Sequence, residues 1–151
     1  MIFICQNLIL LIHIRLILSR VDTDQVKLIQ TWIDQLKMAK EVKGDLLTCD
    51  VKCICHQCNC VTTGSAGIAR KIFAKYPFSN IYKTRKGKDS PGTIAIRGTG
   101  KKYVVNMLAQ YYPGKPKYDN DTKTKRKVWF KQCLNKLSKV KGLGSVAFLI
   151  I

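Results

Sequence analysis

The chain has 151 residues, a length that suits a single domain, and 46% of them are hydrophobic, which argues against global disorder. Twenty-seven Lys and Arg against nine Asp and Glu give a formal net charge of +18. A balance this basic favours a polyanionic partner, such as nucleic acid, a phosphorylated ligand or an anionic membrane surface, or else a solvated face that only keeps the protein soluble.

The N-terminal segment is apolar but interrupted. Residues 2–18 are rich in Ile and Leu, yet they contain Gln6, Asn7, His13 and Arg15. A membrane-spanning helix needs about 20 mostly apolar residues, and a central arginine costs several kcal/mol there. The basic start and small-residue cleavage site of a signal peptide do not occur. We interpret the segment as a buried addition to the domain or as residues ahead of its true start, and a membrane partner is not expected.

The next part of the chain predicts one helix and two strands. Residues 22–36 carry an N-cap signal followed by apolar residues at helical spacing, which predicts an amphipathic helix. Residues 39–43 predict a short strand that ends at the turn pair Gly44–Asp45. Residues 51–56 predict a buried strand.

A second helix is predicted at residues 67–76, after a loop at 62–65. It stops at Pro77, because proline cannot continue a helix. A basic, turn-rich connection follows. The apolar face of this helix is predicted to consist of Ile68, Ile72, Phe73 and Tyr76.

The rest of the chain predicts a hairpin, a helix and a last strand. Residues 93–97 and 103–108 alternate in polarity on either side of a glycine-rich turn. An irregular loop at 111–121 leads to a helix capped by Asp121 or Thr122, and residues 145–151 predict a final apolar strand. This order indicates an α/β fold with a mixed sheet flanked by helices. The core stripe of the last helix is predicted as Trp129, Phe130, Cys133, Leu134 and Leu137.

Three short motifs carry the chemistry: Val-Lys-Gly-Asp-Leu-Leu at 42–47, His-Gln-Cys-Asn-Cys at 56–60 and Gly-Ser-Ala-Gly-Ile-Ala at 64–69. The third is a loop of small residues that opens a helix. The first N–H groups of a helix have no intrahelical acceptor, and its dipole favours an anion. Taken alone, such a loop is also ordinary turn chemistry before a helix.

Together the three motifs resemble the macrodomain family, in the branch that includes ADP-ribose-1''-phosphate phosphatases and related ADP-ribosyl hydrolases, and residues 105–115 also fit that branch. The resemblance implies a three-layer, macrodomain-like α/β domain at residues 41–151, with residues 1–40 outside it. In that family a second glycine-rich loop follows the strand that matches 146–149, whereas this sequence ends at Ile151. The expected domain is therefore incomplete at its C-terminus.

The resemblance also implies a site for ADP-ribose that needs no cofactor. Asp45, with Leu46 beside it, would accept a hydrogen bond from the adenine amine, and Asn59 would hold the distal ribose. His56 matches a position where hydrolytic members keep a functional histidine. Three of these residues have a structural alternative. Asp45 would cap a turn, Asn59 would hydrogen-bond backbone groups at the end of a strand, and His56 would be a core residue. The diphosphate would be cradled by backbone groups around Gly64, Ser65, Ala66, Gly67 and Ile68.

Two functional hypotheses follow from this reading. In the first, the chain is a hydrolase that removes phosphate or ADP-ribosyl groups, with His56 in proton transfer. In the second, it is a non-catalytic binder of ADP-ribose, ADP-ribosylated protein, poly-ADP-ribose or nucleic acid. The second draws on two basic runs: Lys83, Arg85, Lys86, Lys88, Lys101 and Lys102, then Lys115, Lys117, Lys123, Lys125, Arg126, Lys127 and Lys131.

Five of the seven cysteines crowd one short stretch. Residues two apart on a strand rarely form good disulfides, so we expect reduced thiols and an intracellular protein, cytoplasmic or nuclear. Zinc binding is the rival interpretation. The stretch has a single Cys-x-x-Cys spacing and no second ligand pair follows, so no metal site is predicted. The five are Cys49, Cys53, Cys55, Cys58 and Cys60.

Overall fold

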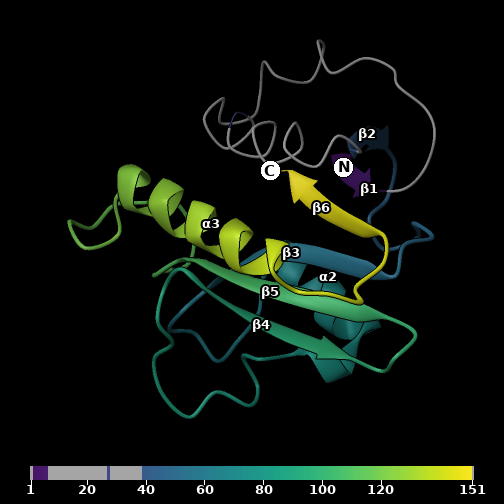
Figure 1. The fold of residues 1–151 in the computed structure, drawn as a ribbon. Helices are drawn as coiled ribbons and strands as arrows, with labels where there is room; N and C mark the ends of the chain where they lie inside the picture. The colour runs from purple at the N-terminus through teal and green to yellow at the C-terminus, as the bar shows by residue number, and fades with distance from the viewer. Residues whose placement is uncertain (1, 7–26, 28–38, 151) are drawn as a thin grey trace.

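The computed structural model describes residues 2–6, 27 and 39–150 (Figure 1). The helix predicted at 22–36 lies outside the described residues except for Lys27, which is helical and exposed. The strands are β1 (Ile2–Gln6), β2 (Ala39–Lys43), β3 (Cys53–Asn59), β4 (Thr93–Gly98), β5 (Tyr103–Gln110) and β6 (Val146–Ile150). The helices are α2 (Gly67–Lys75), the short 3-10 helix η2 (Pro77–Ser79) and α3 (Lys123–Ser138).

The strands form one mixed sheet in the order β2-β1-β6-β3-β5-β4. At its centre β3 runs parallel to both β6 and β5, while β4 is antiparallel to β5 and β1 is antiparallel to both β2 and β6. The α/β class with a mixed sheet is therefore confirmed. Residues 2–6, which we interpreted from the sequence as part of either a buried addition to the domain or residues ahead of its true start, form a strand inside this sheet.

The predicted hairpin is present as β4 and β5. Its turn includes Gly100, whose φ of +88° lies in the left-handed region that favours glycine. At the end of β4, Gly98 lies against the ring of Tyr103, and a Cβ added there would come within 2.1 Å of that ring. The two glycines thus allow the chain to reverse and the strands to meet at this register.

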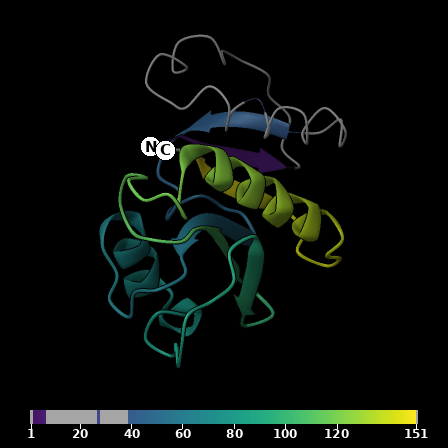
Figure 2. The ribbon, with the colours of Figure 1, turned by 90° about the vertical axis from the view of Figure 1, so that its left-hand side faces the viewer.

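The helices lie on opposite faces of the sheet, as Figures 1 and 2 show. Side chains alternate along a strand, so consecutive residues of β5 face different helices. Val104 packs with Ile72 and Phe73 of α2, whereas Val105 packs with Phe130 of α3. Two buried apolar layers result, one on each side of the sheet, and this makes the domain three-layered.

The predicted helix stripes are mostly confirmed. On α3, Phe130, Cys133, Leu134 and Leu137 are buried, while Trp129 is half-buried. In the helix's first turn the buried residue is instead Arg126. Within the described part of the chain, no helix is both long and apolar enough to cross a membrane.

Candidate functional site

A cleft of about 460 Å³ opens where β3 and β5 end. Asn59 and Gln110, the last residues of the two strands, are paired in the sheet. In open α/β sheets, ligands bind in the crevice beyond the carboxyl ends of the parallel strands, so the position of this cleft is informative. Six of the nine residues predicted for the site line it: Asn59, Gly64, Ser65, Ala66, Gly67 and Ile68.

The small-residue loop forms one wall of the cleft and leads directly into α2. Ala66 is the N-cap of this helix, and it makes no side-chain cap hydrogen bond. The first turn carries no acidic residue, and Gly67 adopts a φ of +53°. The first N–H groups of α2 therefore remain available to an anion beside the cleft.

Asn59 shapes the turn that precedes this loop. Its Oδ1 accepts hydrogen bonds from the backbone N–H groups of Val61 and Thr62, at 3.0 and 2.9 Å. Its Nδ2 donates to Thr62 Oγ1 at 2.8 Å and to the Tyr82 hydroxyl at 3.1 Å. The side chain borders the cleft, but these bonds commit its amide to the turn, as its structural alternative predicts.

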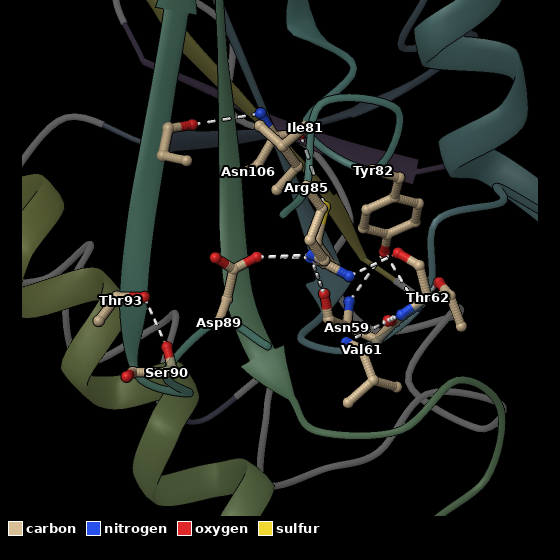
Figure 3. Close-up of polar contacts among 12 residues, drawn as sticks. Asn59, Val61, Thr62, Ile81, Tyr82, Arg85, Asp89, Ser90, Thr93 and Asn106 are labelled. Carbon is tan, nitrogen blue, oxygen red and sulfur yellow. Dashed lines mark hydrogen bonds and ion pairs between the residues drawn. The ribbon is translucent and has the colours of Figure 1, made fainter. Parts of the chain in front are cut away.

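Arg85 closes the same turn from the other side (Figure 3). Its guanidinium donates to the carbonyl oxygens of Thr62 and Asn59, at 2.6 and 2.7 Å, and pairs with Asp89 at 2.7 Å. The group also lies 4.8 Å from the ring centroid of Tyr82. Burial raises the pKa of the Tyr82 phenol above its usual range, so that hydroxyl stays neutral.

The opposite wall comes from the ends of β3 and β5 and from the loop after β5. Gln57 Nε2 donates to Gln110 Oε1 at 2.9 Å, and Gln110 Nε2 donates to the Tyr112 carbonyl at 3.1 Å. Pro113 and Gly114 complete this wall. The polar side chains on this side are thus two amides, held in one orientation by their mutual hydrogen bond and by the Tyr112 carbonyl.

A buried ion pair holds the loop of the second wall. Arg126 donates to both carboxylate oxygens of Asp121, at 2.7 and 2.6 Å, and to the Gly114 carbonyl at 2.6 Å. The Tyr112 N–H donates to the same carboxylate at 2.8 Å. Burial acts to raise the pKa of Asp121, but the hydrogen bonds from Arg126 and Tyr112 outweigh it and hold that pKa below its usual value.

His56, which was expected to transfer protons, is not among the residues that line the cleft. Only 1% of its surface is exposed, because on β3 its side chain points into the layer under α2. Its Nε2 lies 2.8 Å from Asn106 Oδ1, and its ring meets Phe73 edge-on at 5.4 Å. Burial lowers the pKa of His56 to about 4, although the Asn106 contact opposes this. We therefore assign it a role in the core.

Asp45 and Leu46 are also absent from the cleft lining. Asp45 is exposed, and its Oδ1 accepts the N–H of Leu47 at 2.9 Å, which caps a turn after β2. Leu46 is fully buried in the layer under α2. The structure thus brings the loop residues and Asn59 together and leaves Asp45, Leu46 and His56 outside.

Several cleft residues escaped the sequence interpretation because they are distant in the chain. Gln110 could have been found from topology, since parallel strands end at the same edge of a sheet and this polar residue comes two positions after the strand predicted at 103–108. Tyr82 lies in a connection between elements, and no feature of the sequence around it indicates that it lines the cleft. The lining residues that were not predicted are Gln57, Thr62, Ala69, Tyr82, Gln110, Pro113 and Gly114.

The two basic runs divide into buried arginines and surface lysines. Arg85 and Arg126 are held in ion pairs and carbonyl contacts, so they do not belong to a solvent-facing basic surface. Lys102 is half-buried and donates to the Val51 carbonyl at 2.6 Å. The exposed members are Lys83, Lys86, Lys88, Lys101, Lys115, Lys117, Lys123, Lys125 and Lys131.

The crowded cysteines are separated by the sheet. Cys53 and Cys55 lie in the layer under α3, whereas Cys58 and Cys60 lie in the layer under α2. The described residues contain no group of three or more His, Cys, Asp or Glu that could hold a metal ion. Cys53, Cys55, Cys58, Cys60 and Cys133 are free thiols.

Comparison of the chain with protein-family models, with curated proteins and with solved structures found no match.

Proposed function

We propose that the cleft binds ADP-ribose, free or attached to a protein, with the diphosphate at the N-terminus of α2. One observation carries the proposal: the loop at 64–67 lines a cleft and leads into a helix whose N-terminus no side chain caps. Backbone N–H groups and the helix dipole at such a terminus attract phosphate oxygens. The resemblance of the motifs to macrodomains suggests ADP-ribose as the ligand, and the geometry of the cleft supports binding of its diphosphate.

The size and polarity of the cleft suit such a ligand. Its volume of about 460 Å³ is within the roughly 300–1,000 Å³ that small-molecule sites occupy. Gln57 and Gln110 supply amide groups on the wall opposite the loop, where sugar hydroxyls need hydrogen-bond partners. Ile68 and Pro113 add apolar surface. Diphosphate and ribose would therefore lie between the two walls.

The lining favours binding over hydrolysis. Among the described residues, the side chains around the cleft are amides, hydroxyls and apolar groups. Side-chain amides act neither as acids nor as bases near neutral pH, and burial raises the pKa of the Tyr82 phenol away from that range. A general acid or base needs a pKa near the working pH. We propose an intracellular reader of ADP-ribose, a location that the crowding of cysteines in one short stretch supports.

Two matched variants test the proposal by calorimetric titration of ADP-ribose. Ser65 lines the cleft, whereas Thr63 is exposed in the same loop and does not line it. Ser65→Asp places a carboxylate where the diphosphate binds, and we expect an affinity loss of about tenfold or more. Thr63→Asp adds the same charge outside the cleft and should change the affinity little. A carboxylate near a helix N-terminus is tolerated, so the thermal midpoints should stay close to that of the wild type.

Three other results would change this conclusion. Folded wild-type protein that does not bind ADP-ribose would refute the proposal. Release of phosphate or ADP-ribose from modified substrates would favour the hydrolase hypothesis instead. A third result would be that single-stranded oligonucleotides compete with ADP-ribose and that both aspartate variants weaken oligonucleotide binding equally. That result would favour the exposed lysines as a polyanion surface.

A further inference from the structure

We propose that Arg85 is a positioning residue for the cleft: it fixes the turn at 59–62, and thereby the course of the backbone that leads to the loop at 64–67. This inference rests on the proposed function, because the cleft is where the positioned backbone would meet its ligand. The sequence alone places Arg85 in a basic run, which predicts either a surface for a polyanion or a solvated face. The structure instead leaves 2% of its side chain exposed.

The guanidinium bridges three groups that are not neighbours in the chain. It donates to the Thr62 carbonyl at 2.6 Å and to the Asn59 carbonyl at 2.7 Å, while Nε donates to Asp89 at 2.8 Å. The planar fork of arginine matches several acceptors at once, whereas lysine is a point donor on a flexible stem. Both carbonyls belong to residues that line the cleft.

Tyr82 completes a closed set of contacts around the turn (Figure 3). Its hydroxyl accepts the backbone N–H of Asn59 at 2.8 Å, and its ring lies under the Arg85 guanidinium. The backbone N–H of Asp89 donates to the Cys60 carbonyl at 2.9 Å, which ties the arginine's counterion back to the same turn. Residues 82–89 therefore hydrogen-bond both the N–H and the carbonyl groups of the turn at 59–62.

This arrangement has a consequence for binding. Backbone N–H groups bind phosphate best when they already point at it, because a mobile loop must lose conformational entropy on binding. Only Thr63 separates the clamped turn from Gly64, the first loop residue on the cleft. Loosening the turn is thus expected to weaken ADP-ribose binding although Arg85 itself is not a lining residue.

The experiment compares Arg85→Lys and Arg85→Ala with Arg97→Lys, a matched control at an exposed arginine on β4. ADP-ribose affinity is measured by calorimetry. Amide hydrogen exchange is measured on the ligand-free proteins. We expect Arg85→Lys to bind about tenfold more weakly, with faster exchange at 61–67 and unchanged exchange in β5. Low millimolar guanidinium should restore binding to Arg85→Ala, and ammonium should not.

The possible failures are distinguishable. Wild-type protein that binds no ADP-ribose refutes the proposed function, while the exchange data still decide whether Arg85 holds the wall. Wild-type affinity in Arg85→Lys would overturn the positioning role. So would restoration of Arg85→Ala by ammonium as effectively as by guanidinium. If Arg85→Ala does not fold, the comparison of Arg85→Lys with Arg97→Lys decides the question alone.

Discussion

Arg85 and Arg126 each hold one wall of the cleft through backbone carbonyls and one aspartate, but the two aspartates differ in exposure. The side chain of Asp89 is 40% exposed, whereas that of Asp121 is fully buried. Water can therefore solvate Asp89 if its arginine is removed, and it cannot reach Asp121 in the same way. Two similar contacts therefore matter for different reasons: that of Arg85 for the shape of a loop, and that of Arg126 for stability.

The largest expected effect comes from removing the arginine of the buried pair. Arg126→Met leaves the Asp121 carboxylate buried without its ion-pair partner, and we expect the free energy of unfolding to fall by about 3–5 kcal/mol. Arg85→Met should cost less, about 1–3 kcal/mol, because the main loss is the hydrogen bonds to two carbonyls. Urea denaturation of both variants measures the difference. Equal losses would break the comparison of the walls.

The helices and strands that form the two walls were predicted from the sequence better than the arginine contacts that hold the walls in place. The helix at 67–76 and the hairpin strands were predicted within one or two residues of their ends, because periodicity and turn residues are local signals. The strand β3 runs to Asn59 rather than 56, since the polar motif at 56–60 belongs to the strand's end and not to the loop after it.

Only the part of the cleft lining that is contiguous in the sequence was predicted in full. A loop of small residues before a helix can be recognised within six positions, so Gly64 to Ile68 were named. Gln110 and Gly114 reach the cleft through the pairing of β3 with β5, which joins residues about 50 positions apart. A basic run likewise does not indicate which arginine will meet a buried carboxylate, and so the roles of Arg85 and Arg126 came from the structure.

Lowering the pH is expected to reduce the free energy of unfolding about as much as removing one of the two arginines, because His56 is buried in the layer under α2. The pKa of His56 is about 4 in the folded protein, below the value of about 6.5 in an unfolded chain. Between these values the unfolded chain binds more protons, so the free energy of unfolding should fall by about 3 kcal/mol as the pH drops from 6.5 to 4.

The control for this pH effect is His56→Gln, which keeps a donor for Asn106 and removes the titration. Urea denaturation is repeated at several pH values for both proteins, and the difference between them isolates His56. We expect the variant to lose less stability than the wild type across this range. Parallel pH curves for the two proteins would show that the histidine is not buried as described.

The smallest expected effect separates two glycines of the first wall. Gly67 has a φ of +53°, which strains any other residue, so Gly67→Ala should cost about 1 kcal/mol. Gly64 has no left-handed φ, and a Cβ added there meets nothing within 4 Å, so Gly64→Ala should be nearly neutral. Thermal unfolding of both variants provides the measurement. A larger loss for Gly64→Ala would contradict the loop geometry.

The most direct test of the ADP-ribose site is a titration followed by backbone amide chemical shifts in the labelled protein. We expect saturable shifts at residues 64–69, where α2 begins, and smaller ones at Gln57 and Gln110 on the opposite wall. Shifts confined to the exposed lysines of α3, with the loop at 64–67 unaffected, would contradict this expectation and would place the anion on the basic surface instead.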